Sequence, residues 1–466
     1  MPYLKKRKEL CLTEGPLFKK IFIFSFPLIC TNLLQILYNA ADMIVVGKFS
    51  PVQGGVGAIG STTSLINLQL NLVIGISVGA NVLIANAIGA RDEKRTRTAV
   101  HNALWMGLVL GILSMAIGEC FSKPLLLWMD ADPALLDLSV KYVRIYFLGV
   151  PFMGVLNYAI AALRAKGDTK TPLYIMSVSG ILNVILNIIF VAGLGMDVDG
   201  VAWATTVSTA VSCICILIHM RRLSDWCRFE FVRMKNINFT VMGQMVRIGV
   251  PSAIQSSLFS ISNMFIQRSI NGFGPAVVEG NSIAVNVEGI AYTAANAVTQ
   301  ASITFAGQTV GAKKYDRLGK LIRDIYAAAM LVGVVASAFI FVFHQSLFSL
   351  YIREGVAAKD AIMEAAVVRA YYVILPYFLL TFMDVGTGIT RGLGYTTVSM
   401  VISLLGACVF RVVWIYTVFA KFTTYEVLLV SLPISWLLTG AALLASAFWM
   451  RRQYLKKGKT EGVLEN

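Results

Sequence analysis

An acidic residue inside an apolar segment is the first candidate for chemistry in this sequence. Asp42 follows Gln35, Tyr38 and Asn39 within residues 21–46, and this spacing places the four side chains on one face of a helix. A carboxylate surrounded by lipid is costly, so it usually faces a cavity or a partner. The face predicts a wet cavity in which Asp42 carries a proton; the alternative is an interhelical hydrogen bond that only fixes packing.

Two asparagines form a second polar face in the first half of the chain. Asn183 and Asn187 are four residues apart on a predicted helix, so their amides lie on the same side. Such pairs either hold helices together or bind a cation. Asn157 and Thr205 are single polar residues on neighbouring predicted helices, and each has the same two interpretations.

The second half of the chain carries a different set of polar residues. Glu288, Asp384 and Arg411 each lie within an apolar segment. Arg411 could form a salt bridge with Asp384, which is the structural alternative to a role of that acid in binding. We assign Glu288, Asp384 and also Gln255 to a predicted binding cleft.

Enzymatic chemistry has no support in this sequence. The pattern from Gly75 through Ser77 to Gly79 matches a hydrolase nucleophile, but that role needs a strand-to-helix turn, whereas these residues lie in a predicted helix where the glycines suit close packing. No Walker-type phosphate loop is present, and the three histidines lack metal-binding spacing. We therefore expect no enzyme, no metal and no cofactor, and an ion gradient as the energy source for any uphill transport.

The elements that position these residues are predicted to be membrane-spanning helices. The chain has 466 residues, of which 57% are hydrophobic and only 14% charged, against about 25% charged in soluble domains. A span needs about 20 apolar residues. Twelve runs qualify: 21–46, 56–85, 98–121, 140–162, 172–194, 199–220, 243–268, 281–305, 322–347, 367–388, 394–420 and 426–450.

The basic residues are distributed unevenly among the loops. The net charge is +15, and 29 of the 40 Lys and Arg residues, with Arg323 at the start of the ninth run included, belong to the N-terminal segment, the even-numbered connections and the C-terminal segment. This bias predicts that both termini are cytoplasmic. Because the charges stand in short clusters between apolar runs, they do not form a nucleic-acid-binding stripe.

The two halves of the chain repeat each other. Three features recur at offsets of 224, 222 and 227 residues: Pro27 and Pro251, Asn86–Arg91 and Gln308–Lys313, and Arg164 and Arg391. We predict an all-α integral membrane protein of twelve transmembrane helices, in two six-helix bundles related by a pseudo-two-fold axis along the membrane normal. The predicted segments are 1–20 (cytoplasmic), 21–220 (N-lobe), 221–242 (linker), 243–450 (C-lobe) and 451–466 (basic tail).

These ordered motifs resemble the MATE (multidrug and toxic compound extrusion) family. The resemblance covers residues 17–450 and is strongest to the DinF-like branch, with its Gram-positive multidrug exporters. It is carried by Pro27 and Asp42 together with the segments Asn86–Arg91, Gly307–Lys313, Arg164–Pro172, Leu182–Asn187 and Gly200–Thr205.

The resemblance implies two lobes around a cleft that exports organic, often cationic, compounds in exchange for protons or sodium ions. It implies Asp42 as the coupling carboxylate, and the family's neighbours of this acid match Gln35, Asn157, Asn183 and Thr205. We predict an ion-coupling site of Asp42, Asn183, Asn187 and Thr205, and a substrate cleft lined by Gln35, Tyr38, Asn39, Asn157, Gln255, Glu288 and Asp384. The family pattern often has an aspartate at the position of Asn187, so the missing charge favours protons over sodium. We expect a monomer in a bacterial plasma membrane that binds small molecules and no nucleic acid.

A flippase for a lipid-linked precursor is the alternative function, since the wider superfamily includes such proteins. A cleft for lipid phosphates should be lined by several basic residues. The charges predicted inside the membrane are instead Asp42, Asp384 and Glu288 against Arg411. This balance favours organic cations.

Overall fold

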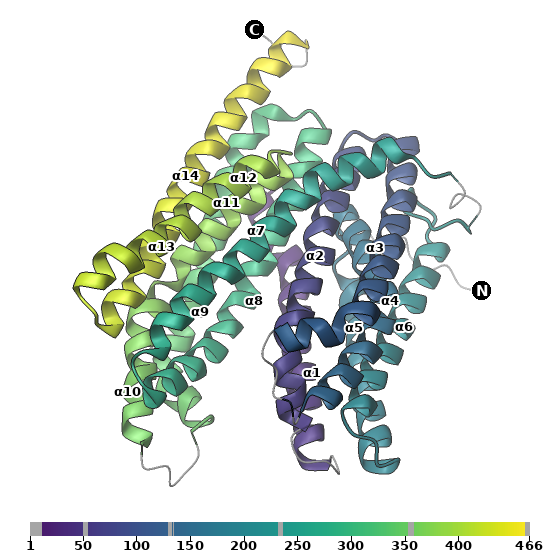
Figure 1. The fold of residues 1–466 in the computed structure, drawn as a ribbon. Coiled ribbons are helices and arrows are strands. Elements are labelled where there is room, and N and C mark those ends of the chain that lie inside the picture. Colours follow the sequence, from purple (N-terminus) through teal and green to yellow (C-terminus); the bar gives the residue numbers. More distant parts are fainter. Residues whose placement is uncertain are drawn as a thin grey trace. The chain divides into compact units, whose positions relative to one another are not determined.

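The computed structural model describes residues 12–49, 55–128, 133, 135–231, 236–352 and 358–461. Throughout these ranges the regular structure is helical, and Figure 1 shows the long helices in order along the chain. Parts of all five predicted segments lie outside the described residues, namely 1–11 of the N-terminal segment, 50–54, 129–132 and 134 of the N-lobe, 232–235 of the linker, 353–357 of the C-lobe and 462–466 of the tail.

The first half of the chain forms six long helical segments. Pro27 lies inside α1, and Pro151 lies inside α4. The segments are α1 (Leu17–Phe49), α2 (Gly55–Gly89), α3 (Glu93–Trp128), α4 (Leu136–Lys166), α5 (Lys170–Asn187) with the π-helical turn η1 (Ile188–Gly193), and α6 (Val198–Arg222).

The second half also forms six long segments, two of which contain π-helical turns. They are α7 (Phe239–Asn271); α8 (Pro275–Gly311); α9 (Leu318–Ser349), preceded by η3 (Tyr315–Arg317); α10 (Lys359–Arg369) continued by η4 (Ala370–Ile374), η5 (Leu375–Tyr377) and α11 (Phe378–Gly392); α12 (Thr396–Ser403) continued by η6 (Leu404–Val409), α13 (Phe410–Trp414) and η7 (Ile415–Phe419); and α14 (Tyr425–Thr460).

These segments confirm the predicted all-α membrane class. Ten helical segments of the described chain are long and apolar enough to cross a membrane. The two remaining long helices, α7 and α8, have the length but not the apolarity. The polar residues that lower their hydropathy include Gln255 and Glu288, which belong to the predicted site.

Two helices each contribute to both compact units of the chain. Among the described residues, unit 1 contains 30–253, and unit 2 contains 12–29 and 254–461. The change of unit therefore falls two residues after Pro27 in α1 and two residues after Pro251 in α7. Proline removes a helical hydrogen bond and favours a bend. The predicted lobes, 21–220 and 243–450, follow the helix count and do not show this exchange of half-helices.

Glycine packing holds the first half of α7 within unit 1. A Cβ atom on Gly79 of α2 would lie 2.1 Å from the carbonyl oxygen of Met245, and one on Gly249 would lie 2.5 Å from that of Ile76. A Cβ on Gly75 would lie 2.5 Å from the Cα of Ala253. The interpretation of Gly75 and Gly79 as a packing face is thus confirmed.

The repeated motifs share backbone conformation as well as sequence. Arg91 and Lys313 hold matching places in their motifs, and both have a φ of 55°, a left-handed conformation that is uncommon outside glycine. Gly167 and Gly394 each follow the matched arginine by three residues, and they have φ values of 103° and 85°. The two halves therefore end equivalent helices in the same way.

Candidate functional site

A chain of side-chain hydrogen bonds connects three helices of unit 1. Asn187 of α5 donates to Asp42 Oδ1 of α1 over 2.5 Å and lies 3.4 Å from Asn183 Oδ1. Asn183 in turn donates to Thr205 Oγ1 of α6 over 3.3 Å. The structure therefore brings together the four residues predicted to form the ion-coupling site.

The surroundings of Asp42 are polar but uncharged. Asp42 is half-buried, and it belongs to no salt bridge among the described residues. The stacked pair Tyr142 and Tyr146 of α4 lies close enough to interact with its charge. Asn187 is fully buried, and its Oδ1 atom accepts no hydrogen bond within the described part of the chain. This arrangement offers a carboxylate and a spare amide oxygen without a competing basic group.

The other candidates of the first half take different positions. Gln35 and Asn39 are exposed on α1. Tyr38 donates its hydroxyl to the carbonyl oxygen of Ser177 over 3.2 Å, and its ring packs over Gly180, where a Cβ would come within 1.8 Å of it.

Asn157 bonds within its own helix. Its side-chain amide donates to the carbonyl oxygen of Met153, four residues earlier on α4, over 2.9 Å. This contact does not involve Asp42 or the asparagines of α5.

Gln255 holds a charged side chain in unit 2. It is buried, with 2% of its surface exposed. Its Oε1 atom accepts from Arg391 Nη2 over 2.8 Å, and its Nε2 atom donates to Ser403 Oγ over 2.7 Å. The contacts of Gln255 are thus those of a residue that positions Arg391.

The salt bridge between Arg411 and Asp384, the structural alternative to a binding role of that acid, is not formed. Arg411 of α13 donates instead to Asn263 Oδ1 over 3.1 Å and to Ser435 Oγ over 3.0 Å. The basic group that interacts with the Asp384 charge is Arg391, seven residues along the same helix. Sequence separation could not distinguish these partners, because each choice depends on which helices pack together.

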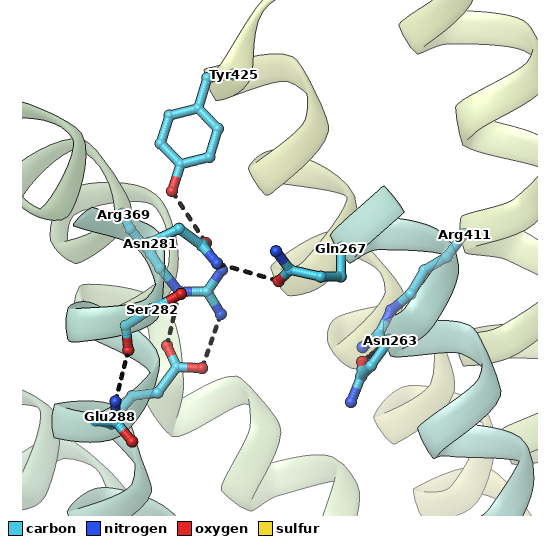
Figure 2. A network of polar contacts seen from close by, with 9 residues as sticks. Asn263, Gln267, Asn281, Ser282, Glu288, Arg369, Arg411 and Tyr425 are labelled. Carbon is cyan, nitrogen blue, oxygen red and sulfur yellow. Dashed lines mark hydrogen bonds and ion pairs between the residues drawn. The ribbon is translucent and has the colours of Figure 1, made fainter. Parts of the chain in front are cut away.

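Glu288 forms a bidentate ion pair inside unit 2 (Figure 2). Arg369 Nη2 lies 2.8 Å from Glu288 Oε1, and Arg369 Nε lies 3.2 Å from Oε2. Arg369 Nη1 donates to Asn281 Oδ1 over 2.7 Å, and the Tyr425 hydroxyl donates to the same atom over 3.1 Å. The sequence reasoning missed Arg369, although its place within the apolar run 367–388 was an available signal.

The buried charges of unit 2 differ from the predicted excess of acidic over basic residues. Arg369, Arg391 and Arg411 lie in or beside its polar clusters, against the two acids Glu288 and Asp384. The expectation of an excess of acids over Arg411 is therefore wrong for this unit. An uncompensated acid is found in unit 1, at Asp42.

Together these features define a class of protein. Long apolar helices in two repeated halves carry polar clusters at membrane depth, and the described residues contain no group of His, Cys, Asp and Glu side chains able to hold a metal. Polar residues at this depth and internal repeats are typical of membrane transporters.

The family profile of MatE matches the chain twice, at residues 27–189 and 251–417. The chain therefore belongs to the MatE family, whose members are multidrug efflux transporters and not enzymes. The two matched regions begin at Pro27 and Pro251, the first pair of residues in the predicted repeat. The predicted family is thus confirmed.

Several curated proteins are similar to this chain. "Probable multidrug resistance protein YoeA" of Bacillus subtilis is 28% identical over 348 residues, which cover 73% of this chain and 75% of that protein. "Probable multidrug resistance protein NorM" of Thermotoga maritima is 24% identical, with coverage of 83% and 82%. "Multidrug export protein MepA" of Staphylococcus aureus is 21% identical, with coverage of 81% and 84%.

Solved structures share the fold. A structure described as an outward-facing conformation of a multidrug resistance MATE family transporter has a TM-score of 0.88 and 21% identity, and covers 97% of this chain and 100% of its own. A transporter from Pyrococcus furiosus, described as having a binding pocket of reverse polarity, has the same TM-score and identity, with coverage of 97% and 99%. At this identity the likeness shows the fold alone.

Proposed function

We propose that this protein exports organic cations in exchange for protons, with Asp42 as the coupling carboxylate. Membership of the MatE family gives the multidrug efflux function. The observation that carries the proposal is the contact of Asp42 with the neutral amide of Asn187, with no basic side chain paired to it among the described residues.

The free-energy cost of an ionised carboxylate at Asp42 can be relieved in two ways. Charge in a membrane interior is costly, so Asp42 is stabilised either by a proton or by a cation, and one carboxyl group cannot be satisfied by both at once. Competition between the two supplies the exchange, because each ligand displaces the other. A paired arginine would remove that competition by neutralising Asp42 permanently.

Sodium is the alternative coupling ion. Asp42, Asn183, Asn187 and Thr205 offer oxygen atoms from three helices, and hard cations prefer oxygen ligands. The buried Oδ1 atom of Asn187, which accepts no hydrogen bond from the described residues, favours this candidate. Protons remain the first choice because a second carboxylate at position 187 is missing.

The remaining features of the transport cycle belong to the same proposal. The excess of Lys and Arg in the terminal segments and even-numbered connections supports cytoplasmic termini in a bacterial plasma membrane. The repeated halves support alternating access by a monomer. The family match gives no support to the alternative of a lipid-precursor flippase.

The test is efflux of a cationic dye from proteoliposomes. A proton gradient and a sodium gradient are applied separately to the wild type, to Asp42→Asn and to Glu279→Gln. Glu279 is exposed at the start of α8, so its variant controls for the loss of one carboxylate.

We expect proton-driven efflux in the wild type and in Glu279→Gln, and its loss in Asp42→Asn. Efflux driven by the sodium gradient and not by the proton gradient would mean that sodium, and not the proton, is the coupling ion. Full proton-driven efflux in Asp42→Asn would remove Asp42 from the coupling step.

A further inference from the structure

Two helical segments of unit 2, α7 and η7, line a cavity near the points where they end. Its volume is about 420 Å³. The residues that α7 contributes share one face of that helix, because they are three, four and seven positions apart. They are Phe265, Arg268, Ser269 and Gly272, and Ile415 and Phe419 line the cavity from η7. Gln267, through which α7 joins the polar network of Figure 2, does not line it.

The cavity lies where both segments reach the same face of the membrane. α7 ends at Asn271 and η7 ends at Phe419. The corresponding predicted spans, 243–268 and 394–420, are the seventh and the eleventh, and odd-numbered spans cross the membrane in one direction. Lipid headgroups, and aromatic side chains that anchor a helix among them, lie at this depth. The cavity is therefore placed at the level of the lipid phosphates.

Arg268 is the one charged residue in the described lining of the cavity. It is exposed, and it belongs to no salt bridge among the described residues. Glu279 and Glu426, the acids that stand nearest to the lining in sequence, are not part of it. A guanidinium fits the two oxygens of a phosphate group with parallel hydrogen bonds. The charge of the lining thus suits an anion and disfavours an organic cation.

The apolar walls continue inward from this cation. Phe265 lies three residues before Arg268 on α7, and Ile415 lies four residues before Phe419 on η7, so both are about one turn deeper. At the outer end Phe273 packs against the ring of Phe419 at 6.1 Å and against that of Tyr425 at 5.8 Å, which fixes the wall to α14. A ligand that matches this lining is anionic at one end and apolar at the end that points into the membrane.

We propose that this cavity binds an anionic phospholipid, with its phosphate on Arg268 and the first part of an acyl chain along Phe265 and Ile415. The inference goes beyond the proposed function, since it concerns unit 2 alone and needs no transport. The volume is in the range of small-molecule sites, which suits a headgroup and the adjoining part of one chain. The rest of both chains stays in the bilayer.

The test compares two phospholipids that differ only in the charge of the headgroup. Dioleoyl phosphatidylglycerol and dioleoyl phosphatidylcholine are titrated against the full-length protein in a neutral detergent, and bound lipid is counted by native mass spectrometry. We expect the first phosphatidylglycerol to bind about fivefold more tightly than phosphatidylcholine, because the choline cation compensates the phosphate that Arg268 would otherwise pair with.

Two variants at position 268 separate a phosphate site from general attraction to a basic surface. Arg268→Gln should abolish the preference for phosphatidylglycerol, and Arg268→Lys should retain only part of it, because an ammonium group lacks the planar fork. The matched control is Lys421→Gln, which removes an exposed cation at the same membrane face that does not line the cavity. Lys421→Gln should bind both lipids as the wild type does.

A third variant fills the cavity without changing its charge. Gly272 lines it, and a Cβ atom there would meet no neighbour closer than the Ser269 carbonyl oxygen at 3.3 Å. Gly272→Leu should therefore weaken the binding of phosphatidylglycerol several-fold. Thermal unfolding in lipid-free detergent checks that Gly272→Leu and Arg268→Gln are folded, and either variant alone keeps the test valid.

Competition with inorganic phosphate distinguishes a lipid from a free anion. We expect dihexanoyl phosphatidylglycerol to displace the bound lipid and inorganic phosphate at the same concentration to leave it in place, since phosphate gains nothing from the apolar walls. Displacement by inorganic phosphate alone would overturn the assignment to a lipid.

Two further results would overturn the proposal. One is equal affinity of the wild type for the two phospholipids. The other is a loss of preference in Lys421→Gln as large as that in Arg268→Gln, which would indicate unspecific attraction to the basic residues at this face. The assay does not depend on Asp42, so it can fail while proton-driven efflux is intact, and the reverse also holds.

Discussion

Asn187 donates its side-chain amide to Asp42 Oδ1 over 2.5 Å, which ties the last turn of α5 to α1. An amide donor stabilises the charged carboxylate by a hydrogen bond without neutralising it. Asp42 therefore keeps a binding partner in both protonation states, while its charge stays available to an ion.

Replacing Asn187 by aspartate should create sodium dependence. Asn187→Asp would place two carboxylates within hydrogen-bonding distance, and like charges this close cannot both remain ionised unless a cation joins them. We expect the melting temperature of Asn187→Asp to rise by several degrees when sodium chloride replaces choline chloride, and that of the wild type to stay unchanged. The measurement is thermal unfolding in detergent.

The matched control for that variant is Asn157→Asp. Asn157 bonds to a backbone carbonyl of its own helix and not to Asp42. Equal sodium responses in Asn187→Asp and Asn157→Asp would contradict the prediction, as would stabilisation of the wild type by sodium.

Much of the fold is predictable because it depends on local patterns. Hydropathy locates the helices, and the repeated motifs locate both halves, since membrane burial acts on each segment separately. The exchange of half-helices after Pro27 and Pro251 does not follow from local sequence patterns. It depends on contacts between segments distant in sequence, such as that of Gly249 with Ile76.

The site, like the fold, has some features that local sequence patterns predict and others that depend on how the helices pack. Helical spacing correctly places Asn183 and Asn187 on one face, and they meet Asp42 through packing of α5 against α1. The partners of the arginines were not predictable in this way. Arg369 pairs with Glu288 from 81 residues away, and Arg411 meets Asn263 from 148 residues away, so only the packed structure selects these pairs.

Replacing one partner of the Glu288–Arg369 ion pair should lower the free energy of unfolding more than replacing both partners by apolar residues. The side chains are only 13% and 7% exposed, and loss of one partner leaves a buried charge. We expect Arg369→Met to reduce the free energy of unfolding by about 3–5 kcal/mol. The double variant Glu288→Leu/Arg369→Met should recover a large part of that loss, measured as a double-mutant cycle.

An exposed ion pair provides the comparison for this cycle. The side chain of Glu93 is 53% exposed beside Arg97, and Arg97 also keeps its contact with Glu230. We expect Glu93→Gln to change the free energy of unfolding by at most about 1 kcal/mol. A double variant of Glu288 and Arg369 that is no more stable than Arg369→Met would show that the pair is not the relevant interaction.

Gly180 should control the position of the Tyr38 ring. A Cβ atom there would lie 1.8 Å from the ring, so Gly180→Ala must displace Tyr38 from α5 and from its hydrogen bond with Ser177. If Tyr38 lines the substrate cleft, Gly180→Ala should change the apparent affinity for an aromatic cation in the same direction as Tyr38→Ala. Concentration-dependent dye efflux measures both. A change of affinity in Tyr38→Ala but not in Gly180→Ala would mean that Gly180 does not control the position of the Tyr38 ring.

The packing of α7 on α2 predicts opposite effects for two glycines in the same half-helix. Gly249→Val would force side-chain atoms into the backbone of Ile76, and overpacking costs about 1–3 kcal/mol. Gly243 is exposed with no atom within 4 Å of a Cβ, so Gly243→Ala should add about 0.5–1 kcal/mol through helix propensity.

The measurement for this pair is thermal unfolding in detergent, which should order the proteins as Gly243→Ala, wild type and Gly249→Val from most to least stable. Gly249→Ala should fall between the wild type and Gly249→Val, because even a single methyl group would lie 2.5 Å from the Ile76 carbonyl oxygen. Wild-type stability in Gly249→Val would mean that α7 moves away from α2 without cost. In that case its first half would not be fixed within unit 1 by this contact.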